Sequence, residues 1–333
     1  MAPAIQNAVA NAESMRDMFI RMIVAIAGET QRFDLQTLLS YPIITYPLSL
    51  AHSDGSYVKT DKSALLKKLE ELQTEPVAEL DIPCNHSQVY DGGLLLHSVV
   101  SQTNIGASYA SIARSILSVA CSGRATEVHV CLDKYIENSI KDSERKLRGA
   151  VDAPYVITGP NQTIRQNGQK LLGNGMFKNE LGKFLMNEWG KDHYHHIFKG
   201  KTVFVSHGGE CQQYIPDDVQ HITVTKPANL QGNHEEADTL IAFHVANITA
   251  SHIVVRASDT DVLVILIGAL GWQRPEVRTM ASVIMDCGMG NTRRYINVSN
   301  ITNALQETNP RLPRALPGFH AFTGCDFTSA FYR

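Results

Sequence analysis

HEEADTLIAFHVANITASHIVVRASDTDVLVILIG, residues 234–268, contains two long apolar segments, and acidic residues stand at the start of each. The acids are Glu235, Glu236 and Asp238 before the first segment, and Asp259 and Asp261 before the second. A carboxylate at such a boundary is either an ordinary helix cap or turn residue, or part of the wall of a binding site. The rest of the sequence helps to separate these two interpretations.

The spacing of apolar residues predicts a helix, a strand and a second buried segment within this stretch. Residues 235–250 carry apolar side chains on one helical face. Residues 251–261 are rich in β-branched side chains and predict a strand. Residues 262–270 predict a helix or a further buried run, because periodicity does not separate those two in a short apolar segment.

The alternation of strands and helices extends in both directions from this stretch, beginning at about residue 87. Further strands are predicted at residues 87–91, 127–135, 201–210, 221–226, 277–288 and 293–301, and further helices at 104–121, 139–149 and 178–191. The adjacent Gly208 and Gly209 predict a turn. Strands that are apolar on both faces and alternate with helices form mostly parallel, covered sheets. The predicted fold class is therefore α/β, with a mostly parallel central sheet and helices on both faces.

The residues before this region have a different pattern of apolar side chains. Residues 14–28 and 59–73 have helical periodicity, and a turn-rich segment separates them. Neither helix carries an arrangement of side chains that predicts chemistry. We therefore expect a mainly helical extension over residues 1–85, followed by a single α/β domain over residues 86–333.

Composition restricts the class of protein. The chain has 333 residues and a formal net charge of -3, which argues against binding nucleic acid over the whole surface but allows a local basic patch. The six cysteines include no CxxC pair, so we expect buried, reduced thiols rather than a zinc ribbon. The amino terminus lacks the continuous apolar stretch of a signal peptide. We expect an intracellular protein, nuclear or cytoplasmic.

Acidic residues recur where the predicted strands end. Asp91 follows QVY, Asp133 follows VHVCL, and Asp259 and Asp261 follow IVVRAS, so all four fall at the predicted carboxyl ends of strands. Ligands of open α/β sheets bind outside the carboxyl ends of the strands. Each acid taken alone is better explained as a cap or turn residue, which stabilises a helix by about 1 kcal/mol.

Taken together, the acids favour a cation site. Two carboxylates ~5 Å apart repel by about 3 kcal/mol at an effective dielectric near 20, so a cluster requires raised pKa values or bound cations. Oxygen-only ligands favour hard ions such as Mg²⁺ or Mn²⁺. A pair of such ions can hydrolyse phosphodiester bonds.

The order of these acids resembles that of the PIN-like 5′-nuclease superfamily, which includes flap endonucleases. The matching motifs are Asp91 in VYDGG, Asp133 in CLDKY, Glu236-Ala237-Asp238, Asp259-Thr260-Asp261 and Gly324-Cys325-Asp326, within residues 87–333. The chain also resembles a group of animal proteins that share HEEADT, DTDV and HAFTGCD blocks, from which no activity carries over.

The resemblance implies a nuclease of DNA or RNA that uses two divalent ions, Mg²⁺ or Mn²⁺. The implied ligands of the first ion are Asp91, Asp133, Glu236 and Asp238. The implied ligands of the second are Asp259, Asp261 and Asp326, with Asp238 shared. All seven acids are therefore candidate catalytic and metal-binding residues.

Basic residues follow Asp133 in KYIENSIKDSERKLRG. Lys141, Arg145 and Arg148 would share one helical face, and the resemblance implies that basic residues here, Lys134 among them, contact nucleic acid. A solvated helix face with balanced charges is an equal alternative.

The chain departs from the resembled enzymes at both ends. It has about ninety residues before Asp91, and it ends seven residues after Asp326. We expect the domain to be truncated at its carboxyl-terminal DNA-binding module. Two alternatives stay open: a catalytically inactive nucleic-acid or protein interaction module of mobile-element origin, and a metal-dependent phosphatase or nucleotide hydrolase.

Overall fold

The computed structural model describes residues 16–17, 19–20, 62–73, 76–136, 153–272 and 281–325. The chain divides into two compact units, one formed by residues 62–317 and one by residues 1–61 and 318–333. The larger unit therefore includes residues 62–85 of the predicted extension. The rest of that extension lies outside the described residues, apart from four helical residues at 16–17 and 19–20.

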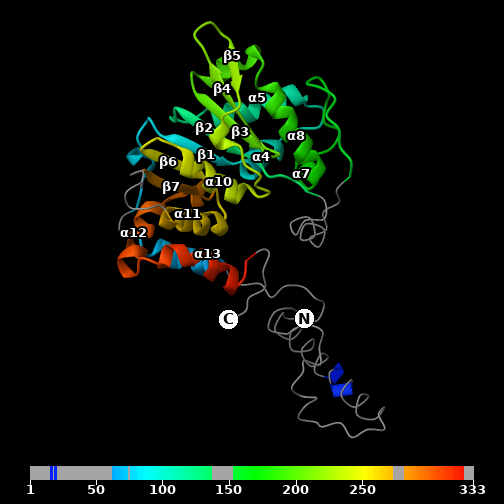
Figure 1. Cartoon of the computed structure of the whole chain (residues 1–333). Coiled ribbons are helices and arrows are strands. Elements are labelled where there is room, and N and C mark those ends of the chain that lie inside the picture. The colour runs from blue at the N-terminus through cyan, green and yellow to red at the C-terminus, as the bar shows by residue number, and fades with distance from the viewer. Residues whose placement is uncertain are drawn as a thin grey trace. The chain divides into compact units, whose positions relative to one another are not determined.

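The described part of the larger unit contains an eight-stranded sheet (Figure 1). Its strands lie in the spatial order β5-β4-β3-β2-β1-β6-β7-β8. In chain order they are β1 (Ser87–Asp91), β2 (Glu127–Cys131), β3 (Thr202–His207), β4 (Glu210–Pro216), β5 (Ile222–Thr225), β6 (His252–Arg256), β7 (Ser282–Cys287) and β8 (Arg294–Asn297).

The five central strands are parallel, and the three outer strands are antiparallel to their neighbours. The predicted α/β class, with a mostly parallel sheet, is therefore confirmed. β4 was not predicted, since its sequence ECQQYIP alternates polar and apolar residues only weakly. It pairs with β3 across the two-residue turn Gly208-Gly209, and both glycines have the positive φ that such hairpin turns require.

Helices cover both faces of the sheet, as predicted (Figure 1). One face packs against α4 (Gly92–Val100), α5 (Tyr109–Ala120), α7 (Gly168–Leu172), α8 (Gly175–Glu188) and α9 (His195–Phe198). The other packs against α3 (Lys62–Glu70), α10 (Ala237–Asn247), α11 (Thr260–Trp272) and α12 (Val298–Thr308). A last helix, α13, spans Leu312–Thr323.

The alternation of side chains along each central strand explains why both faces need covering. In β6, Val255 faces the α10 and α11 side, and its neighbour Val254 faces the opposite side with Ile284. All three are nearly or fully buried. Successive strand residues point to opposite faces, so a strand that is apolar throughout has to be covered on both.

The order of the parallel strands determines where a site can form. The chain runs outward from β1 through β2 to β3, and later returns to place β6 against the other edge of β1. Helices that follow β1 and β6 then lie on opposite faces of the sheet, because parallel crossovers are right-handed. Ligands of open α/β sheets bind at such a reversal, outside the carboxyl ends of the strands, which here are β1 and β6.

Among the described residues, none of the helices has both the length and the apolar character that a bilayer crossing requires.

The core of the sheet gives a direct test of the fold. Val255 in β6 is fully buried, whereas Val224 in β5 is 43% exposed. We expect Val255→Ala to lower the free energy of unfolding by about 2–3 kcal/mol, because it removes buried methyl groups and leaves a cavity. Val224→Ala, the same change in an outer strand, should cost less than about 0.5 kcal/mol. Urea denaturation of both variants measures the difference, and equal losses would contradict this assignment of the core.

Candidate functional site

The acids predicted at strand ends do lie at one edge of the sheet. Asp91 is the last residue of β1, Asp133 follows β2 by two residues, and Asp259 follows β6 by three. The three strands are adjacent and parallel, in the order β2-β1-β6. Their carboxyl ends therefore share one edge, which includes the reversal of strand order described above.

Each of these three acids also caps a helix. The Asp91 Oδ1 atom accepts hydrogen bonds from the N–H groups of Gly93 (2.8 Å) and Leu94 (3.3 Å) at the start of α4. Asp133 Oδ1 accepts from the first N–H of α10, that of Ala237, at 2.8 Å.

The third cap is at the start of α11, where Asp259 Oδ1 accepts from the N–H of Asp261 at 3.0 Å. The amino termini of α4, α10 and α11 therefore converge on the acidic edge. The partial positive charge of a helix amino terminus favours nearby carboxylates, so the fold itself offsets part of their mutual repulsion.

Two more acids come from the start of α10. Glu236 is the residue immediately before this helix, and Asp238 lies in its first turn. Because α10 packs against β1 and β2, its amino-terminal turn lies close to the strand ends that carry the other acids.

The charges of these acids are strongly coupled. The pKa of Asp238 is raised to about 8, first by burial and then by four neighbouring carboxylates, which are Asp259, Asp91, Asp133 and Glu236. The pKa of Asp91 is raised to about 6, first by burial and next by Asp133, while its two cap hydrogen bonds oppose the shift. The fold has therefore gathered five carboxylates from four separate segments within electrostatic reach of one another.

Asp261 and Asp326 differ from these five. The Oδ2 atom of Asp261 forms an ion pair with Lys62 Nζ at 2.8 Å, and both side chains are largely buried. Lys62 is the first residue of α3, so the helix before the sheet supplies the cation. Asp326 lies outside the described residues, and its role stays a prediction.

Of the predicted nucleic-acid contacts, only Lys134 is described. Its Nζ atom donates to Asn233 Oδ1 at 2.8 Å, which ties the segment after β2 to the loop before α10. Nearby, the Lys178 ammonium lies 4.8 Å from the centre of the Tyr135 ring. Lys141, Arg145 and Arg148 lie outside the described residues, so their role also stays a prediction.

A buried chain of hydrogen bonds, absent from the sequence-based predictions, fixes α10 to the sheet. His244 of α10 contacts Ser206 of β3 through Nε2 (2.8 Å) and His129 of β2 through Nδ1 (2.8 Å). His129 continues to Glu127 at 2.9 Å. The only sequence signal was an isolated histidine in each of two apolar segments. These hydrogen bonds hold α10, which carries Asp238 in its first turn, against the sheet.

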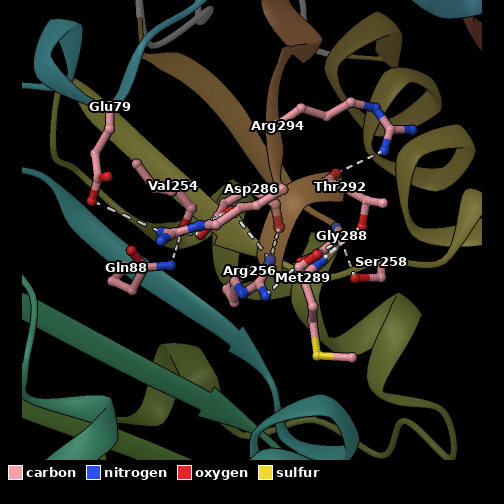
Figure 2. A network of polar contacts seen from close by, with 11 residues as sticks. Glu79, Gln88, Val254, Arg256, Ser258, Asp286, Gly288, Met289, Thr292 and Arg294 are labelled. Carbon is pink, nitrogen blue, oxygen red and sulfur yellow. Dashed lines mark hydrogen bonds and ion pairs between the residues drawn. The ribbon is translucent and has the colours of Figure 1, made fainter.

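A second network that the sequence did not indicate surrounds Asp286 of β7 (Figure 2). Asp286 is only 4% exposed. Arg256 of β6 bonds to it at 3.1 Å, and Arg293 bonds to both of its carboxylate oxygens at 2.9 Å. The sequence signal was a single charge in each of two apolar strands, IVVR and VIMDC, which does not reveal that the two charges pair.

The five coupled carboxylates fit a hard divalent cation in chemistry, because they offer only oxygen ligands and carry excess negative charge. Within the described ranges, no three His, Cys, Asp or Glu side chains already surround a common ion position.

No protein-family model, no curated protein and no solved structure matches this chain. Function therefore has to be inferred from the residues, geometry and charge of the site.

The raised pKa values predict how stability depends on pH when no metal is present. Between about pH 4 and pH 8 the folded protein holds protons on Asp238 and Asp91 that the unfolded chain has released. The free energy of unfolding should therefore fall as pH rises through this range. Asp238→Asn carries no charge at this position, so its melting temperature should exceed that of wild type near pH 8.5 and match it near pH 5.

Thermal denaturation in EDTA across this pH range measures the effect. The exposed Asp218 provides a matched control, and Asp218→Asn should follow the wild-type curve. If wild type and Asp238→Asn keep a constant difference in melting temperature from pH 5 to pH 8.5, the carboxylates are not coupled.

Proposed function

We propose that this protein is a divalent-metal-dependent nuclease that hydrolyses phosphodiester bonds of DNA or RNA. The observation that carries the proposal is the coupling of Asp238 to four other carboxylates at the carboxyl ends of β1, β2 and β6. Like charges that lie close together at the carboxyl-terminal edge of an open α/β sheet raise the free energy of the folded state unless a cation neutralises them.

In this proposal, the acids that hold Mg²⁺ or Mn²⁺ are Asp91, Asp133, Glu236, Asp238 and Asp259. A bound divalent ion would supply positive charge to the phosphate and to the oxygen that departs from it. The helix amino termini at Asp91, Asp133 and Asp259 orient the carboxylates through the cap hydrogen bonds. The hydrogen bonds of His244 fix α10, which also carries Asp238, to the sheet.

The resemblance to PIN-like nucleases implied a second ion, and its implied ligands are less well supported. Asp261 would have to leave its ion pair with Lys62 to bind that ion. The proposal therefore rests on one cation at the five coupled carboxylates, with Lys62 as a fixed positive charge beside them.

The substrate class follows from the same resemblance. Lys134 lies directly after Asp133 and would be available to a substrate phosphate if its bond to Asn233 opened. Lys141, Arg145 and Arg148 would extend this basic segment along a nucleic-acid backbone.

A catalytically inactive interaction module is the second candidate. The Lys62–Asp261 ion pair favours it, because an internal ammonium already neutralises one of the predicted metal ligands. A protein of this kind would bind nucleic acid without cleaving it.

A cleavage assay distinguishes these candidates. We expect the wild-type protein to hydrolyse labelled single-stranded or flap-containing DNA, or the corresponding RNA, with Mg²⁺ or Mn²⁺ and not in EDTA. Asp91→Asn and Asp259→Ala should each lower the rate by about a hundredfold or more, because each removes a cation ligand. Asp218→Asn should leave the rate unchanged. Equal cleavage by wild type and Asp259→Ala would exclude the assignment, and binding without cleavage would favour the inactive module.

Cation binding can be measured without catalysis. At pH 8, free Mn²⁺ at about a hundred times its Kd should stabilise the wild-type fold by ~2.7 kcal/mol. Asp238→Asn should lose most of this stabilisation, because it removes a charge at the centre of the cluster. The measurement is a melting-temperature titration with Mn²⁺. The same shift in wild type and in Asp238→Asn would mean that the ion binds elsewhere.

A further inference from the structure

A cavity of about 660 Å³ lies against the sheet face opposite α10 and α11, over β1, β6, β7 and β8. The right-handed crossover between β6 and β7 places α11 on the other face. β7 then passes to β8 through a hairpin. In the described part of the chain, neither connection places an α-helix over this cavity, and the segment around Ile82 covers only part of the same face.

The floor of the cavity is a row of side chains in register across four strands. Tyr90 of β1 is paired with Arg256 of β6, which is paired with Asp286 of β7, which is paired with Tyr295 of β8. Partners at paired positions of neighbouring strands project to the same face. All four residues line the cavity.

The cavity has a net positive lining. Three guanidinium groups line it, from Arg124, Arg256 and Arg293, against two carboxylates, from Glu79 and Asp286. The charge of Asp286 is already neutralised, because the guanidinium groups of Arg256 and Arg293 both contact this buried carboxylate.

The three arginines differ in exposure and in what holds them. Arg124 donates to the carbonyls of Glu79 and Ile82, and Arg256 to those of Asp286 and Gly288, so both are built into the fold. The Arg293 side chain is 42% exposed and forms ion pairs with the Asp286 carboxylate and, at 3.9 Å, with that of Glu79. Unlike Arg124, which is also exposed, it is held by side chains rather than by backbone carbonyls, so it is the guanidinium that can most readily turn toward an anion entering from solvent.

The remaining lining suits a flat ring. The Arg293 guanidinium lies 5.5 Å from the centre of the Tyr295 ring. Ile82, Val119 and Met289 add apolar surface, and Met289 is 58% exposed. Burial raises the pKa of both Tyr90 and Tyr295, so both phenols stay neutral and can donate hydrogen bonds.

We propose that this cavity binds a nucleoside monophosphate, with the phosphate at Arg293 and the base against the tyrosine, methionine and aliphatic side chains. Guanidinium groups match phosphate geometry, and bases stack on tyrosine rings. The volume falls within the ~300–1,000 Å³ of small-molecule sites and is far larger than inorganic phosphate needs. This site uses none of the carboxylates of the proposed nuclease, so the proposal does not depend on that activity.

The experiment is calorimetric titration of the whole protein with AMP at pH 7 in EDTA. EDTA removes any cation-mediated binding at the acidic cluster, whose carboxylates then repel a phosphate. We expect AMP to bind, and both adenosine and inorganic phosphate to bind at least tenfold more weakly, because each lacks one half of the recognised chemistry.

Variants at the cavity mouth test the position. Arg293→Gln should weaken AMP binding by about tenfold or more through loss of a charge-assisted hydrogen bond. Met289→Glu should weaken it by replacing apolar surface that contacts the base with a negatively charged side chain, and it leaves the Asp286 network intact. Arg165→Gln changes an exposed arginine outside the cavity and should leave the affinity unchanged.

Three results would overturn the proposal: no AMP binding to wild type at millimolar concentration, unchanged affinity in both Arg293→Gln and Met289→Glu, or inorganic phosphate binding as tightly as AMP. Loss of binding in Asp91→Asn alone would place the nucleotide at the acidic cluster, and would also overturn it. A 5′-phosphorylated tetranucleotide separates two sources of the ligand. Tighter binding than AMP would identify a strand end as the occupant, and weaker binding a free nucleotide.

Discussion

Repulsion among carboxylates at one edge of the sheet is the constraint around which this fold is arranged. Asp91, Asp133 and Asp259 each end or follow a parallel strand, and each also caps the amino terminus of a helix. A cap of this kind stabilises a helix by about 1 kcal/mol, so every acid has a local reason to be there. The pKa of Asp238 is raised to about 8, first by burial and then by the repulsion from the other four carboxylates. Three of these acids therefore cap helices, as the structural interpretation predicted, and their cap hydrogen bonds offset part of the repulsion within the cluster.

Much of the fold could be predicted from sequence because its signals are local. The segments SQVYD, which ends at Asp91, and EVHVC, which precedes Asp133, are strands at the expected places, and their acids lie at the expected edge. β4 was missed, since its polar and apolar residues alternate poorly. The pairing of Asp261 with Lys62 could not be predicted either. The two residues are 199 positions apart, and no local pattern states which long-range partner a charged side chain will find.

The two faces of the sheet acquire different chemistry from the handedness of its connections. Crossovers from β1 and β6 bury opposite faces, and a hairpin follows β7, so helices do not cover the two faces equally. The polar row that starts at Tyr90 lies on the α4 and α5 face, in the part next to β7 where neither of its connections places an α-helix, while the acidic edge begins one residue later at Asp91. One strand thus contributes to both the polar row and the acidic edge, because its side chains alternate in direction and its last residue lies at the edge.

The pairing of β1 with β6 joins residues that are far apart in the chain. The Gln88 side chain donates to the carbonyl of Val254 across 166 residues. During synthesis, β1 to β5 would be made well before β6, and β1 would then be an unpaired sheet edge with the apolar Val89 uncovered. Exposed edges of this kind promote association between incomplete chains, and distant pairings form slowly. The acidic edge would thus be among the last parts to assemble, and a nascent chain that ends before residue 252 would depend on chaperones to stay unaggregated.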